Sequence, residues 1–133
     1  MSNGLASPAA VNNLASGLLK IGDSLHATLR RLSDANSMNV GETYRLLTEE
    51  YALKSRVHAL AIQPQNYVVH GLKIKDEELG SLLDRVNRLI QADLSHEQLS
   101  IIVADLIAFT AMVFTKKPHL IELMGAELEG SLL

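Results

Sequence analysis

The stretch from Leu99 to Phe114, LSIIVADLIAFTAMVF, constrains the fold more than any other part of the chain. Polar residues recur at every fifth position along it and just beyond it, at Ser100, Asp105, Thr110 and Thr115. At about 100° per residue this spacing scatters them around a helix, so the helix has no polar side. A helix that is apolar all round belongs in the middle of a bundle. We therefore expect a central hydrophobic helix near residues 96–117.

The rest of the chain divides into segments that each carry one apolar stripe at helical spacing. The expected helices cover residues 8–33, 40–62, 76–93, 96–117 and 119–128. The sequence predicts an all-α fold, a single-domain bundle of four main helices plus a short C-terminal helix. Residues 1–133 form one domain in this interpretation, with residues 1–7 as a flexible tail.

Helix starts are marked by residues that cap helices well. Ser7 precedes Pro8, Asn39 precedes the second helix, and Asp76 is expected to cap the third. Ser95 with Gln98 three residues later is a capping box. These signals fix where the chain changes direction.

One charged residue falls within the apolar stripe of the second helix. Glu50 lies between Leu46 and Leu53, and Lys54 follows it by four residues. Residues four apart share a helix face, so the sequence predicts an ion pair between Glu50 and Lys54.

The segment Tyr67–Ile74, YVVHGLKI, has the only strand-like composition. A lone strand needs a partner. Two interpretations stay open, a crossover loop packed on the bundle or an edge strand paired with its copy in a dimer. We expect the loop.

Composition limits the cellular compartment and the kinds of partner that we expect for the protein. The chain has no cysteine, which excludes disulfides and thiolate metal sites. Its first residues, MSNGLASPAAVNN, lack the basic start and apolar run of a secretory signal, so we expect a cytoplasmic protein. Residues 1–75 hold eight basic and five acidic side chains, a charge of +3, which leaves −6 for the remainder of a chain of net charge −3.

A membrane span is not expected. The apolar stretch has 16 residues, fewer than the roughly 20 that a bilayer requires, and it contains Asp105. Such a carboxylate is costly inside an apolar helix unless it is paired. One interpretation pairs it with a basic residue of the first or second helix or places it at the edge of its helix. The other lets it set helix register or recognise a basic partner.

No pattern of residues predicts catalysis. The histidines are scattered one per segment, without helical zinc spacing, at His26, His58, His70, His96 and His119. We find no Glu-x-x-His motif, phosphate-binding loop or nucleophile elbow. The sequence therefore predicts no catalytic residue, no cofactor and no metal ion, and enzyme activity is not expected.

Helical bundles with one reactive histidine include the histidine phosphotransfer domains. Those domains place a lysine and a glycine just after the histidine. Here Ala-Thr-Leu-Arg follows His26 and Ala-Leu-Ala-Ile follows His58, so neither matches. A phosphotransfer domain, or another enzyme with a dispersed site, stays an alternative.

The leading hypothesis is a non-catalytic protein–protein interaction module, such as an adaptor, regulator or small chaperone, acting through helical apolar surfaces. We expect a homodimer, because every helix carries an apolar stripe. The first helix is the expected partner-facing or dimer-facing element, through Leu14, Leu18, Ile21 and Leu25, with Asp105 as a further candidate. A second alternative is a DNA-binding regulator that uses basic residues of the N-terminal half: Arg30, Arg31, Arg45, Lys54 and Arg56.

Overall fold

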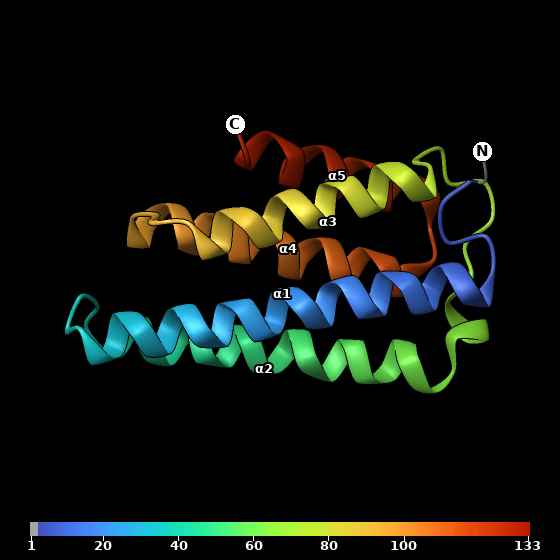
Figure 1. The fold of residues 1–133 in the computed structure, drawn as a ribbon. Coiled ribbons are helices and arrows are strands. Elements are labelled where there is room, and N and C mark those ends of the chain that lie inside the picture. The colour runs from blue at the N-terminus through green and yellow to red at the C-terminus, as the bar shows by residue number, and fades with distance from the viewer. Residues whose placement is uncertain (1–2) are drawn as a thin grey trace.

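Five α-helices make up most of residues 3–133, which are the residues that this computed structural model describes. They are α1 (Pro8–Asp34), α2 (Val40–Ile62), α3 (Asp76–Gln91), α4 (His96–Thr115) and α5 (Pro118–Ser131), with a short 3-10 helix, η1 (Pro64–Tyr67), after α2. Successive helices run in opposite directions, and α1 lies between α2 and α3 (Figure 1). The predicted all-α fold is confirmed.

Helix boundaries follow the polar caps. The side chains of Ser7, Asn39 and Ser95 each accept a hydrogen bond, 2.7–3.2 Å long, from the amide three residues further on. Gln98 bonds back to the Ser95 amide and completes the predicted capping box. These bonds satisfy amides that have no partner within the helix, so α1, α2 and α4 begin where the sequence predicts.

The start of α3 differs from the prediction that Asp76 caps it. Asp76 is the first residue of α3, and its carboxylate accepts a hydrogen bond of 3.2 Å from the amide of Leu5. Glu78 instead accepts from the amide of Lys75 at 3.0 Å. Asp76 therefore anchors the N-terminal segment rather than the first turn of its own helix.

Within the predicted flexible tail over residues 1–7, residues 3–5 pack against the rest of the chain, and residues 1 and 2 lie outside the described part of the chain. Leu5 is completely buried. The amide of Gly4 donates to the carbonyl of Ile74 at 2.7 Å, and the carbonyl of Leu5 accepts from Val69 at 2.8 Å. A Cβ on Gly4 would lie 2.5 Å from the Ile74 oxygen, so only glycine allows this close approach.

The segment after η1 is a crossover loop, as expected. Val69 and Leu72 within it are buried in the core. Its backbone pairs with residues 3–5 of the same chain, including an isolated antiparallel bridge between Asn3 and Lys75. The strand-like composition of this segment thus finds a partner within the chain.

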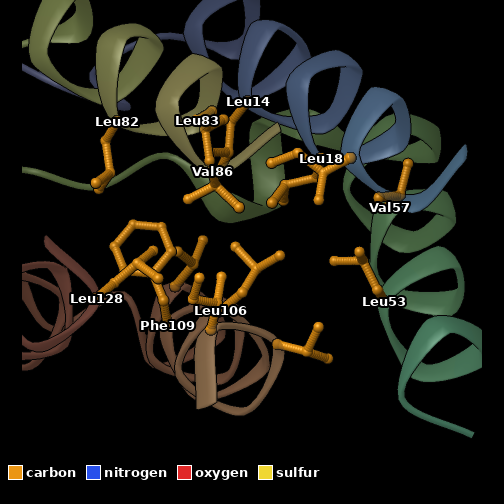
Figure 2. Packing of buried hydrophobic residues seen from close by; sticks show 14 of the residues in the cluster. Leu14, Leu18, Leu53, Val57, Leu82, Leu83, Val86, Leu106, Phe109 and Leu128 are labelled. Carbon is orange, nitrogen blue, oxygen red and sulfur yellow. The ribbon is translucent and has the colours of Figure 1, made fainter. Parts of the chain in front are cut away.

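Apolar side chains from all five helices meet in one core. Figure 2 shows Leu14 and Leu18 of α1, Leu53 and Val57 of α2, Leu82, Leu83 and Val86 of α3, Leu106 and Phe109 of α4, and Leu128 of α5 pointing toward a common centre. Thr28 is buried among them and its hydroxyl donates to the carbonyl of Ile90 at 3.0 Å, which satisfies one polar group in the core.

The prediction that the helix near residues 96–117 is central is wrong. α1 packs along its length against both α2 and α3, whereas α4 packs mainly against α5 and α2. The buried residues of α4 follow one face: Leu99, Ile102, Val103, Leu106, Phe109, Thr110 and Val113. On the opposite face Ile101 is 51% exposed and Ala104 is also exposed. Apolar composition all round α4 thus does not mean burial all round.

α4 is the one helix within residues 3–133 whose length and mean hydropathy, 1.8 over 18 residues, would suffice to cross a membrane. Of that window 39% is buried against the rest of the chain. Length and composition are weak evidence for a span, because the core helix of a soluble bundle has the same properties.

Candidate interaction surface on helices α1 and α2

The four α1 residues predicted to face a partner lie inside the chain. Leu14, Leu18, Ile21 and Leu25 are each at most 4% exposed. Leu14 and Leu18 point into the core shared with α2, α3 and α4 (Figure 2). Their long regular seam joins α1 to its own neighbours, so the structure leaves none of the four available to a partner.

Asp105 is half-buried on the side of α4 that faces α5. The hydroxyl of Ser131, in the last turn of α5, donates a hydrogen bond to its carboxylate. Its partner is thus a serine of the last helix and not a basic residue of the first or second helix, while its half-burial agrees with the alternative of a position at the edge of α4. The bond ties the end of α5 to the middle of α4.

Four of the five large apolar residues that are exposed on α2 form a line on its outer face, and the fifth, Ile62, is the last residue of the helix. Val40, Tyr44, Leu47 and Tyr51 are between 40% and 85% exposed and are spaced by four, three and four residues. This spacing keeps them on one side of the helix. We call these four residues the α2 stripe.

The sequence does contain a signal for the α2 stripe. Its four residues repeat at helical spacing beside the stripe that faces the core, which includes Leu46, Leu53 and Val57. In the sequence, Tyr44, Leu47 and Tyr51 look like the edge of that buried stripe. The structure shows that all three are exposed. Only one of the two apolar stripes of α2 packs into the core, so the other remains on the surface.

A hollow of about 300 Å³ lies between α1 and α2 beside the α2 stripe. Leu47 belongs to both features and joins them. The hollow is lined by His26, Leu29, Arg30, Ser33, Asp34, Thr43 and Leu47. Leu29 and Leu47 give it apolar walls, and Arg30 and Asp34 add one basic and one acidic side chain, so an apolar side chain with polar neighbours would fit it.

A charged cluster at the next turn holds α1 and α2 together. The carboxylate of Glu50 is 8% exposed, and its two oxygens each lie 3.1 Å from Nδ1 of His26. Nζ of Lys54 lies 3.0 Å from the same carboxylate and 3.5 Å from Asp23. A buried carboxylate is costly unless it is paired. Two partners here satisfy it, and the predicted ion pair of Glu50 with Lys54 is confirmed.

Hydrogen bonding to Glu50 raises the pKa of Lys54 above its ordinary value, and the nearby charges of Glu50 and Asp23 add to this. Partial burial of the Lys54 amine acts in the opposite direction but is outweighed. Lys54 therefore stays protonated at neutral pH, and its charge balances that of Glu50.

The basic residues of α2 bind other helices. The Arg56 guanidinium donates to the Ile107 carbonyl and to the Thr110 hydroxyl, both at 2.7 Å. Arg45 donates to the Ser100 hydroxyl at 2.6 Å. Together with Lys54, three of the five side chains of the DNA-binding hypothesis make contacts within the bundle. That hypothesis stays a prediction with no observation in its favour.

The histidines are not gathered with other ligands in the part of the chain that the structure describes, where no group of three His, Asp or Glu side chains could hold a metal ion. His26 pairs with Glu50, and His96 lies 3.5 Å from Glu42. Among these, His26 combines a buried carboxylate partner with an imidazole that is 54% exposed.

Comparison with models of protein families, with curated proteins and with solved structures finds no match to this chain.

Proposed function

We propose that the protein is a non-catalytic interaction module that binds an amphipathic helix of a partner protein along the α2 stripe. The observation that supports this most is the line of four large apolar side chains exposed over three turns of α2. Two of the four are tyrosines, which are enriched at the energetically important positions of protein interfaces. Scattered exposed apolar residues are common, but a continuous line of them marks a docking surface.

A helix is the partner segment that this surface suits. The stripe spans the 12 residues from Val40 to Tyr51, about 16 Å along the helix axis. A partner helix lying beside it would place its own apolar residues, three and four apart, against Val40, Tyr44 and Tyr51. The hollow beside Leu47 would take one larger side chain as an anchor.

The platform beneath the stripe is prearranged. The contacts among His26, Glu50 and Lys54 fix α1 against α2 at the turn below Leu47. A surface that is already ordered loses less conformational entropy when it binds. Binding at this hollow would therefore require side-chain adjustment rather than movement of a helix.

The test uses the tagged protein as bait and compares two variants that each place a glutamate at an exposed apolar position. Tyr51→Glu disrupts the stripe, whereas Leu123→Glu changes α5, where Leu123 is 58% exposed. We expect wild type and Leu123→Glu to retain the same bound proteins and Tyr51→Glu to lose them. A segment of the bound protein, synthesised as a peptide, should then bind with a Kd about tenfold or more weaker to Tyr51→Glu. Equal binding by all three would exclude the stripe.

The geometry of His26 favours a second candidate, a phosphoryl acceptor. An ionised carboxylate only accepts hydrogen bonds, so the Glu50 oxygens require a proton on Nδ1 of His26. The lone pair is then on Nε2 of an exposed imidazole. Nε2 would form a new bond to the phosphorus of a donor such as phosphoramidate, whose nitrogen is already protonated. The donor's own P–N bond would break, neutral ammonia would leave, and the proton on Nδ1 would stay on the ring beside Glu50.

Incubation with phosphoramidate tests this second candidate. Acid-labile phosphate on the wild type that is absent from His26→Gln and retained by His58→Gln would support it. A wild type that takes up no phosphate would exclude it. Neither result depends on the α2 stripe, so the two candidates are tested independently.

A further inference from the structure

The exposed side of α4 is a second unoccupied apolar surface, separate from the α2 stripe. Its residues are spaced by three, four, three and one positions along one side of the helix: Ile101, Ala104, Ala108, Ala111 and Met112. Ile101 and Ala104 are exposed and the other three are half-buried. We call these five residues the α4 outer face. This face is apolar although it does not belong to the core, because the buried residues of α4 lie on the opposite side of the helix.

From this face we infer that two copies of the chain associate through α4, with the two α4 helices antiparallel. The identity of the occupant follows from the charges at the two ends of α4. Glu97 is exposed in the first turn, and Lys116 and Lys117 are exposed just after the last turn. Thus α4 has an acidic side chain in its first turn and two basic side chains just after its end.

Only the antiparallel arrangement pairs opposite charges. With the twofold axis between residues 106 and 107, Glu97 of each copy lies opposite Lys116 of the other, and Lys117 is next to it. A parallel pair would bring Glu97 to Glu97 and the lysines to the lysines. The helix dipoles favour the same choice, because antiparallel helices place positive ends beside negative ends.

Side-chain size along the face suits the same axis. Ala104 of one copy lies at the height of residue 109 of the other. Phe109 points into its own core, so the outer-face residue nearest to Ala104 is Ala108 of the other copy. Small side chains at the centre let two helices approach at the short end of the usual 8–10 Å range of interaxial distance. The close contact therefore falls at the methyl groups of Ala104 and Ala108, with the half-buried Asp105, which accepts a hydrogen bond from Ser131, beside them.

The same axis places Met112 of one copy opposite Ile101 of the other. Beside Ile101 is a hollow of about 310 Å³, whose walls are largely apolar and include Leu89, Leu94, Ile102 and Leu132. Methionine is flexible and fills irregular apolar space well. The second copy would thus supply the side chain that this hollow lacks, and the twofold axis would fill both hollows.

Sedimentation of the wild type and two matched variants tests whether the face associates. Ala108→Glu places a carboxylate at the centre of the outer face, and Ala27→Glu makes the same change at an exposed position of α1. We expect dimers for wild type and Ala27→Glu, and a Kd raised about tenfold or more for Ala108→Glu. Circular dichroism checks that the helices are intact. A wild type that is monomeric at all concentrations overturns the inference.

Charge reversal provides a readout that does not touch the core. Glu97→Lys and Lys116→Glu, made separately, should each weaken the dimer, and the double variant should recover much of the loss. In a parallel dimer each reversal would merely replace one like-charged pair with another, so neither loss nor recovery would be seen. Loss without recovery, or no change, contradicts the antiparallel pairing.

Disulfide trapping fixes the orientation, since an introduced cysteine is the only one in the chain. Ile101→Cys and Met112→Cys should form little disulfide alone, because residues 101 of the two copies would be about 16 Å apart along the axis. Mixed together, they should cross-link. Cross-linking of either variant with itself contradicts the arrangement. So would a monomer in solution that floats with anionic phospholipid vesicles, which would make lipid the occupant of the face.

Discussion

Nζ of Lys54 lies 3.0 Å from the carboxylate of Glu50, one turn earlier on α2 and almost fully buried. Nδ1 of His26 approaches the same carboxylate from α1 at 3.1 Å. One buried anion is thus shared by a cation of its own helix and an imidazole of the neighbouring helix. His26 also lines the hollow beside Leu47. The same contact therefore stabilises the pair of helices α1 and α2 and helps to shape the proposed docking surface.

Glu50→Ala should lower the free energy of unfolding by about 1–3 kcal/mol. The change leaves the partly buried Lys54 amine and the His26 imidazole without their shared partner and removes packing between α1 and α2. Urea denaturation followed by circular dichroism measures the effect. The control is Glu127→Ala on the exposed face of α5, which should change stability by less than about 0.5 kcal/mol. Equal effects of the two changes would show that the cluster adds no stability.

The raised pKa of Lys54 predicts a loss of stability at alkaline pH. A group whose pKa is higher in the folded state stabilises that state fully below its unfolded pKa, here the ordinary value of 10.5. The contribution disappears as the pH rises through the higher folded-state value. Lys54→Met lacks this contribution, so the difference in unfolding free energy between wild type and Lys54→Met should be constant at neutral pH and shrink above about pH 10. A constant difference throughout would contradict the assigned cause.

Two glycine substitutions should have opposite signs. Gly4→Ala places a Cβ 2.5 Å from the backbone oxygen of Ile74, so it should destabilise by about 1–3 kcal/mol. Gly80→Ala adds a methyl group to an exposed position of α3 with no atom within 4 Å, so it should stabilise by about 0.5–1 kcal/mol. Thermal and urea unfolding of both variants check this. A neutral Gly4→Ala would mean that residues 3–5 are not packed in solution as the structure places them.

Arg56→Leu should destabilise the contact of α2 with α4. The guanidinium holds both the Ile107 carbonyl and the Thr110 hydroxyl, and leucine can bond to neither. We expect a loss of about 1–3 kcal/mol in unfolding free energy, with Arg45→Leu at the exposed Ser100 contact costing less. Arg56→Lys should recover only part, since one amine lacks the planar fork of arginine. A cost for Arg45→Leu that matches Arg56→Leu would argue against a special role of Arg56.

Helix positions were predictable because their signals are local. Ser7, Asn39 and Ser95 cap helices through bonds to amides three residues away, so neighbouring sequence determines them. The capping role of Asp76 was predicted wrongly because its actual partner is Leu5, 71 residues away. The packing of residues 3–5 was missed for the same reason, since the burial of Leu5 depends on a loop far along the chain.

The packing arrangement of the helices was less predictable. The hydrophobicity of a residue shows that its burial is favourable, but it does not show which neighbouring helix buries it. The apolar sequence of α4 predicted a central helix, yet the bundle covers one side of it and leaves Ile101 exposed. The seam of Leu14, Leu18, Ile21 and Leu25 predicted a partner-facing helix, yet it is the core seam of α1. The candidate surface on α2 was missed because Tyr44 and Tyr51 flank a buried stripe that already explained the helix.

Hydrogen exchange with and without the bound partner segment tests most directly whether the protein works through the α2 stripe. We expect added protection of amides in residues 40–51 of α2 and in residues 26–34 of α1 beside the hollow, with α3 and α5 unchanged. The same segment should protect neither region of Tyr51→Glu. Protection confined to α3 and α5, or equal protection of wild type and Tyr51→Glu, would contradict the proposed docking surface.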